Sequence, residues 1–245
     1  MTRIGFAYNQ KPEPNVGLVS AISSEPRSEE EPPSIDDAYA EWDSAETIDA
    51  VASALSAYGE VVRLEATEEF PERLRAERPD IVFNIAEGLR GSNREGHVPA
   101  ICEFFDVPFS GSDPFTLSLC LHKARTKEVL TARGIPNAPF TLIESESSLV
   151  ALLDRNDQLP LFLKPVQEGS SKGITEKNLV RTREELESQA RFLLETYNQP
   201  VIAEDFLTGA EFTCGVLGNG DGARVLPIVA INFDSLPEGA VPIYG

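Results

Sequence analysis

Cysteine is scarce in this sequence and never occurs at the spacing of a metal-binding pair. The 245 residues include only Cys102, Cys120 and Cys214, and no C-x-x-C is present. The sequence therefore indicates neither a disulfide framework nor a zinc site. Each cysteine has apolar neighbours, so we expect all three to be buried as small hydrophobic side chains.

Long apolar runs are also absent. No stretch approaches the roughly 20 consecutive apolar residues that a membrane-spanning helix needs. The first residues, MTRIGFAYNQ, lack the long apolar core of a signal peptide. These two absences argue against a transmembrane segment and lead us to expect a cytoplasmic protein.

Basic residues are about half as frequent as acidic ones. The chain has 21 Lys and Arg against 40 Asp and Glu, which gives a net charge of −19. This charge argues against nucleic acid and anionic membrane surfaces as partners. A small anionic ligand stays compatible with it, because such a ligand needs only a local cluster of lysines and backbone donors.

Strand and helix patterns alternate through the first 85 residues. Apolar runs predict strands at residues 3–8, 60–64 and 81–85. Helical spacing predicts helices at residues 47–58 and 70–78, and Asp43 with Glu46 is predicted to form a capping box at the start of the first helix. Such alternation indicates a parallel sheet covered on both faces, with ligands beyond the carboxyl ends of its strands.

An acidic stretch interrupts this alternation after the first strand. Residues 25–49 contain ten acidic residues, one arginine and three prolines. We expect a solvated insertion or surface cover, and a loop lying over the site is the alternative.

The loop at residues 86–97, AEGLRGSNREGH, follows the third predicted strand. It contains three glycines and several charged side chains close together in the sequence. The next helix begins near Gly96, and its N-terminus would favour an anion here. His97 is either part of this site or simply the first residue of that helix.

The following residues complete the first domain, which we expect to end near residue 112, and then predict a small α+β unit at 138–204. We expect a helix at 98–105 with Ile101, Phe104 and Phe105 facing inward, then a short strand at 107–110. Asp113 caps the next helix, and Lys123 begins a further one that is rich in basic residues. Residues 138–204 follow the order β-α-β-loop-α-β, and the segments 211–217 and 224–233 read as antiparallel strands.

The sequence LFLKPVQEGSSKG at residues 161–173 joins an apolar strand to a Gly/Ser loop. Such a loop can offer backbone N–H groups and hydroxyls to phosphate oxygens, with Lys164 and Lys172 adding charge. A lysine-bearing surface turn is the alternative. The loop is not a Walker P-loop, since G-x-x-x-x-G-K-[ST] does not occur in this chain.

Three separated motifs carry the strongest functional signal. They are Gly111-Ser112 with Lys123, then Lys164-Pro165 with Glu168-Gly169-Ser170-Ser171-Lys172-Gly173, then Glu204-Asp205-Phe206-Leu207 with Gly209-Ala210-Glu211-Phe212-Thr213. In this order and spacing the chain resembles the ATP-grasp enzymes and, among them, the D-alanine–D-alanine ligases. The resemblance covers roughly residues 80–245.

The resemblance implies an α/β fold with three parts. They are a Rossmann-like pre-ATP-grasp domain with a parallel sheet at residues 1–112, an ATP-grasp α+β central subdomain at 113–203, and the start of a C-terminal sheet at 204–245. The acidic loop at 25–45 belongs to the first part.

The resemblance also implies roles for individual residues. Lys123 and Lys164 would neutralise phosphate charge, under a lid that carries Glu168, Gly169, Ser171 and Gly173. The strand end of Glu204, Asp205, Phe206 and Leu207 would contact adenine, and Glu211 would accept hydrogen bonds from the ribose. The implied catalytic residues are Ser170 in the lid and Glu95 in the loop that helps to bind an amino-acid substrate.

The activity implied is ATP-dependent carboxylate–amine ligation through an acyl phosphate, with small amino acids as substrates and a use in peptidoglycan synthesis. Relatives often form homodimers. The family binds Mg²⁺ through residues that we expect beyond residue 245, so we expect a C-terminally truncated chain that does not itself catalyse ligation. The family's substrate-binding glutamate has no match here, and Glu41 and Glu46 are the candidates to replace it.

Two other functions stay open from the sequence. One is a nucleotide- or amino-acid-binding module without ligase activity. The other is a periplasmic-type or flavodoxin-like binding domain that does not bind ATP.

Overall fold

A three-stranded parallel sheet forms the first lobe of the chain. The computed structural model describes residues 1–12, 37–155, 159–234, 236 and 243. Strand β1 (Arg3–Tyr8) lies at the centre of this sheet, between β2 (Glu60–Glu65) and β3 (Ile81–Asn84). The predicted central position of the first strand is confirmed.

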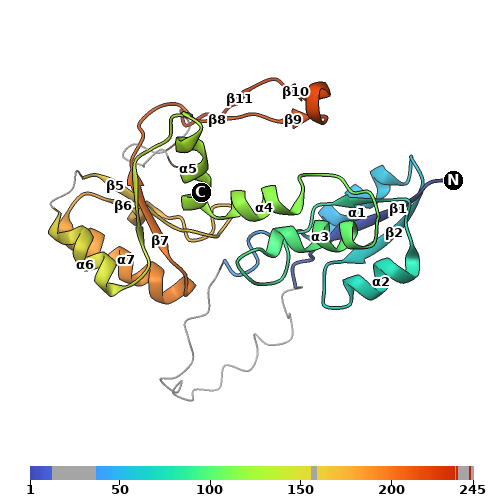
Figure 1. Ribbon diagram of the computed structural model, residues 1–245, viewed down its shortest axis with the longest axis horizontal. Helices are drawn as coiled ribbons and strands as arrows, with labels where there is room; N and C mark the ends of the chain where they lie inside the picture. The colour runs from blue at the N-terminus through green and yellow to red at the C-terminus, as the bar shows by residue number, and fades with distance from the viewer. Residues whose placement is uncertain (13–36, 156–158, 235, 237–242, 244–245) are drawn as a thin grey trace, which may run out of the picture.

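Helices cover both faces of this sheet (Figure 1). Successive strand residues point to opposite faces. Phe6 therefore packs with Ile48 of α1 (Ala45–Leu55), whereas its neighbour Ala7 belongs to the core on the other face. That second core is built with α2 (Phe70–Glu77) and α3 (His97–Phe104). The predicted parallel sheet with two covered faces is confirmed.

Several local predictions in this lobe are wrong. The N-cap of α1 is Ser44, whose Oγ accepts a hydrogen bond from Thr47 N at 3.2 Å. Asp43 is instead held beside the end of the first strand, where its N–H donates to Asn9 O at 3.0 Å. Phe104 is 82% exposed rather than inward. The predicted strand at 107–110 is reduced to a single bridge to β3.

A four-stranded antiparallel sheet forms the second lobe, in the order β4-β7-β5-β6. The strands are β4 (Phe140–Ile143), β5 (Leu161–Pro165), β6 (Leu179–Val180) and β7 (Val201–Asp205). Helices α6 (Glu146–Asp154) and α7 (Arg183–Tyr197) build the large core on one face, whereas Ala124 of α5 (Lys123–Ala132) packs with Ile202 on the other. The predicted β-α-β-loop-α-β order is confirmed, except that the loop contains the short strand β6.

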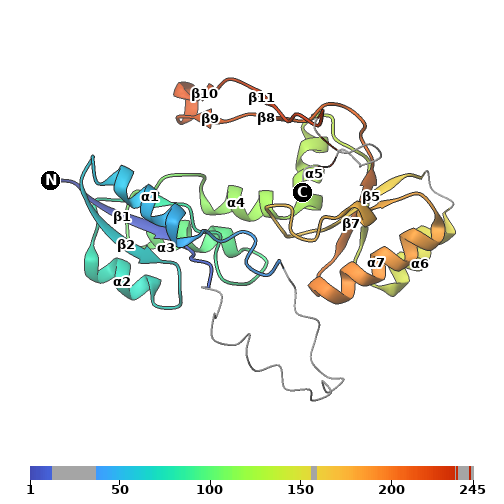
Figure 2. The same ribbon diagram turned by 180° about the vertical axis from the view of Figure 1, so that it is seen from behind.

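Helix α4 (Pro114–Leu121) lies between the two lobes (Figures 1 and 2). Asp113 caps it as predicted, with its Oδ1 accepting from Thr116 N at 3.0 Å. Of the cysteines, only Cys102 is buried, whereas Cys120 on α4 is exposed. The prediction that all three cysteines are buried is therefore wrong.

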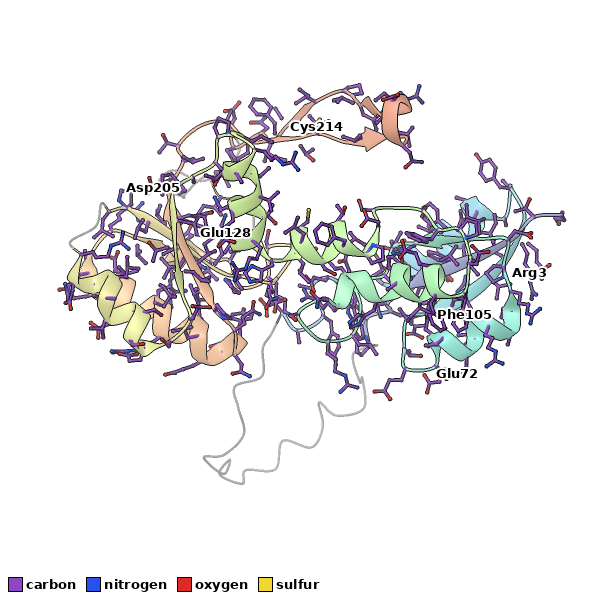
Figure 3. All side chains as sticks on the ribbon, in the orientation of Figure 1. Arg3, Glu72, Phe105, Glu128, Asp205 and Cys214 are labelled. Carbon is purple, nitrogen blue, oxygen red and sulfur yellow. The ribbon has the colours of Figure 1, made fainter. Side chains whose placement is uncertain are left out.

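An extended antiparallel arm follows β7. It contains β8 (Phe212–Thr213), β9 (Val216–Leu217), the short 3-10 helix η3 (Gly220–Gly222), β10 (Arg224–Val225) and β11 (Val229–Ala230). Strand β8 pairs with β11 and β9 with β10, so the predicted antiparallel strands form as two short pairs. Every residue from 207 to 230 is exposed, including Cys214, labelled in Figure 3.

Candidate functional site

A cavity of about 680 Å³ lies between α5, the ends of β5 and β7, and the loop at 166–174. The site residues predicted from the sequence that line it are Lys123, Lys164, Glu168, Gly169, Ser170, Ser171, Glu204, Asp205, Phe206, Leu207 and Glu211. Gly173 and Glu95 do not line it. Lys172, also predicted to add charge, lines it too, as do the motif residues Pro165, Gly209 and Ala210. Lining residues that the sequence did not indicate are Lys127, Asn137, Ala138, Phe162, Ile174 and Ile243.

Two lysines converge on Glu204 in this cavity. Lys164 Nζ lies 2.5 Å from Glu204 Oε1, and Lys127 Nζ lies 2.9 Å from Glu204 Oε2. The pairing follows from register, because Glu204 of β7 faces Phe162 of β5, two residues from Lys164. Burial would raise the pKa of Glu204, but the two ammonium groups bring it below its ordinary value.

A third lysine comes from the start of α5. Lys123 Nζ donates to the backbone oxygen of Glu168, and Lys123 N donates to Val166 O at 2.9 Å. Burial, and then the positive charge of Lys164, lower the pKa of Lys123. Lys127 lies one helical turn further along α5, so the four-residue spacing from Lys123 was the sequence signal for it.

The loop between β5 and β6 has an unusual backbone. Ser170, Ser171 and Gly173 adopt φ values of +44°, +59° and +76°. These values lie in the left-handed region, which costs most residues free energy. The buried Asn178, at the end of the 3-10 helix η2 (Glu176–Asn178), holds the loop by donating to Gly173 O at 2.8 Å and to Leu163 O at 2.7 Å.

Acidic side chains of the first lobe contact this loop. Glu41 Oε1 accepts from Gly169 N at 2.6 Å, and Asp37 Oδ2 accepts from Gly173 N at 2.7 Å. Glu41 is therefore brought to the loop, whereas Glu46 is exposed on α1. Most of the acidic stretch predicted at 25–45 lies outside the described residues, and its described end lies against the loop.

The loop after β3 adds carboxylates near the same place. Glu95 belongs to η1 (Arg94–Gly96), and its Oε1 would lie 3.8 Å from a Cβ placed on Gly169. Burial raises the pKa of Glu95, against the effect of Arg94. Burial, together with Glu95 and Glu41, raises the pKa of Glu87 to about 7. His97 is exposed at the start of α3.

The cavity has the chemistry of a nucleotide site. Four lysine side chains and a Gly/Ser loop suit a polyphosphate. The rings of Phe162 and Phe206, with centroids 5.9 Å apart, offer an apolar surface to a flat base. Among the described residues, no group of three or more His, Cys, Asp or Glu side chains could hold a metal ion. In the same part of the chain, none of the helices has the length and apolar character that a membrane-spanning helix needs.

Comparisons with known proteins agree with this chemistry. The family described as D-ala D-ala ligase C-terminus matches residues 129–236. The D-alanine–D-alanine ligase of Bordetella pertussis is 38% identical over 151 residues, which cover 61% of this chain and 45% of that relative. The chain thus spans less than half the length of this curated relative.

Solved structures match over nearly the whole chain. The D-alanine–D-alanine ligase of Bacillus anthracis matches with a TM-score of 0.65 and 21% identity, over 94% of this chain and 64% of that one. The same enzyme complexed with ATP gives a TM-score of 0.62 and 19% identity, over 96% and 67%. At these identities the structures establish the fold.

The chain has the fold of the D-alanine–D-alanine ligase structures, which is the ATP-grasp fold. Its sequence is similar to that of the D-alanine–D-alanine ligases, through the family match at residues 129–236 and the curated relatives.

Proposed function

We propose that this protein is an ATP-dependent carboxylate–amine ligase that forms an amide bond through an acyl phosphate. The observation that carries the proposal is the convergence of Lys123, Lys127 and Lys164 on one cavity beside the Gly/Ser loop. The similarity to D-alanine–D-alanine ligases supports D-alanine as the first substrate to test, and peptidoglycan synthesis as the use of the product.

The cavity suggests how ATP would bind. The phosphates would lie against Lys123, Lys164 and the loop at 168–173, with Ser170 and Ser171 covering them. The base would lie along Asp205, Phe206 and Leu207, and Glu211 would accept from the ribose hydroxyls. The solved ATP complex of a structural neighbour supports ATP as the nucleotide.

The reaction would proceed in two steps. A substrate carboxylate attacks the γ-phosphorus of ATP and releases ADP, which leaves an acyl phosphate. A substrate amine then attacks the acyl carbon, phosphate departs and an amide remains. The lysines would stabilise the negative charge on the transferred phosphoryl group. Ser170 in the loop and Glu95 beside Gly169 are the proposed catalytic residues of this chain.

Some parts of the proposal depend on the ligase assignment rather than on geometry. Mg²⁺ would accompany ATP, and the described residues do not offer it a cluster of three or more His, Cys, Asp or Glu ligands. An enzyme that uses ATP is expected in the cytoplasm, and a homodimer is expected by analogy. The division into units at 1–112, 113–203 and 204–245 is proposed on the same basis.

The test combines binding with turnover. We expect calorimetry to detect ATP binding by this protein in the presence of Mg²⁺. Phosphate release from ATP and formation of D-alanyl-D-alanine, measured with added D-alanine, show whether the chain also turns over. ATP binding without amide formation would favour a nucleotide-binding module. Absence of ATP binding would overturn the nucleotide site itself.

A further inference from the structure

Arg94 is a buried cation that joins three segments far apart in the sequence. Its side chain is 9% exposed. Arg94 Nη2 donates to both carboxylate oxygens of Glu41, at 2.6 and 2.8 Å, and to Glu168 Oε2 at 3.2 Å. Arg94 Nη1 donates to Gln167 O at 2.8 Å. The guanidinium therefore connects η1 of the first lobe with Glu41 and with the loop of the second lobe.

The two carboxylates that Arg94 contacts are buried. Glu41 and Glu168 are 5% and 9% exposed, so each needs a partner to offset the cost of burial. Glu168 also receives Lys172 Nζ at 3.0 Å and Gln199 Nε2 at 2.7 Å. Loss of Arg94 would leave Glu41 without its only ion pair among the described residues.

The network acts on the backbone of the loop. Glu41, held by Arg94, accepts from Gly169 N, and Arg94 itself donates to the carbonyl of Gln167. These contacts fix the entry to the left-handed turn at Ser170 and Ser171. Arg94 does not line the nucleotide cavity, whereas Gly169 and both serines do.

We propose that Arg94 is a positioning residue that, through Glu41 and Glu168, holds the loop at 167–173 in the conformation that closes on a nucleotide phosphate chain. This inference deepens the proposed function and rests on it. Arg94 acts from the other lobe, so the position of the loop is coupled to the position of the first lobe. A planar guanidinium suits this task because it reaches two carboxylates and a carbonyl at once.

The experiment uses two readouts on Arg94→Gln. Amide hydrogen exchange of peptides spanning 167–174 reports the loop directly, and peptides from β1 report whether the protein is folded. We expect exchange in the loop to accelerate roughly tenfold or more, because charged hydrogen bonds are lost. The second readout is the Kd of a non-hydrolysable ATP analogue, which should rise about tenfold while the Kd of adenosine stays unchanged.

Three further variants make the result specific. Arg90→Gln is the matched control, because Arg90 lies in the same loop after β3 but is 78% exposed. Arg94→Lys should restore part of the protection and affinity, since one ammonium cannot span both carboxylates. Glu41→Gln should give a smaller effect than Arg94→Gln, and the double variant should lose less than the sum of the two. Arg94→Lys and Glu41→Gln decide the question if Arg94→Gln does not fold.

The outcomes separate this inference from the function on which it rests. Unchanged exchange in the loop of folded variants would overturn the role of Arg94, whatever binds in the cavity. Faster exchange with an unchanged Kd for the analogue would also overturn it. If the wild type binds no nucleotide, the proposed function fails, and with it the role of Arg94 in nucleotide closure.

Discussion

Glu204 and Lys164 form a close ion pair across neighbouring antiparallel strands, with Nζ 2.5 Å from Oε1. Glu204 is almost buried and also pairs with Lys127, so one carboxylate orders two cations beside the cavity. Because these ammonium groups are already held in place, little conformational entropy remains to be lost when a phosphate binds.

Lys164→Ala is expected to weaken ATP binding. Loss of one charged hydrogen-bond donor costs about 1.5 to 3 kcal/mol, which corresponds to a Kd roughly 10- to 150-fold higher. Calorimetry with ATP and with adenosine measures this, and adenosine should be little affected. Lys177→Ala is the matched control, since Lys177 is exposed and does not line the cavity. Equal ATP affinities of wild type and Lys164→Ala would contradict the phosphate assignment.

Glu87 should make stability depend on pH. Its pKa is raised from 4.5 to about 7, so between these values the folded protein holds more protons than the unfolded chain. Stability must therefore fall as pH rises through this window. Between about pH 5 and pH 8, we expect the free energy of unfolding to fall less for Glu87→Gln than for the wild type. The expected difference is on the order of 1 to 2 kcal/mol, which is less than the full pKa shift implies because Glu87 is partly exposed to solvent.

Urea unfolding at the two pH values measures this difference. Glu103→Gln serves as control, because Glu103 is exposed on α3. Parallel pH profiles for Glu87→Gln and the wild type would refute the expectation.

Gly173 and Gly111 provide a matched pair of substitutions. Both have positive φ, +76° and +96°. A Cβ on Gly173 would lie 2.6 Å from Pro165 Cγ and 3.0 Å from Tyr197 Cζ, whereas a Cβ on Gly111 would meet nothing within 4 Å. We expect Gly111→Ala to cost about 1 kcal/mol of backbone strain and Gly173→Ala about 2 to 4 kcal/mol, because steric overlap is added. Similar urea midpoints for the two variants would show that the loop relaxes freely.

Asn178→Ala should destabilise the second lobe. The buried amide donates to Leu163 O and Gly173 O, and its Oδ1 accepts from Thr175 N at 3.0 Å. Truncation leaves these backbone groups unpaired, at a cost of about 2 to 3 kcal/mol. Ser188→Ala, exposed on α7, should stay within about 0.5 kcal/mol of the wild type. Denaturant unfolding compares the two, and a cost for Asn178→Ala as small as that of the control would mean that water replaces the amide.

Local patterns predicted much of the fold. Strand β1 has the predicted bounds, and β2 and α2 match theirs to within one residue, because their apolar spacing agrees with their burial. Asp43 failed as an N-cap because a long-range pairing with Asn9 competes with the cap. The prediction that Phe104 faces inward is wrong because this residue lies on the exposed side of α3. The buried positions of that helix are Val98, Pro99 and Cys102.

The sequence motifs predicted some residues of the candidate site and not others. The motif residues Lys123 and Lys164 follow from the order of the three motifs, and both line the cavity. The network of Arg94 with Glu41 and Glu168 joins positions more than 50 residues apart, which local patterns cannot pair. Their roles stay predictions until the variants are measured.

The antiparallel register of β5 and β7 has a consequence for how this chain can vary in length. Side chains alternate between the faces of a strand, so one residue inserted before Lys164 or Glu204 would turn that side chain away from its partner. The exposed tip of the arm, at η3, lies outside any paired strand, and insertions there should be tolerated. Insertions and deletions among natural variants should therefore be frequent at this tip and rare within β5 and β7.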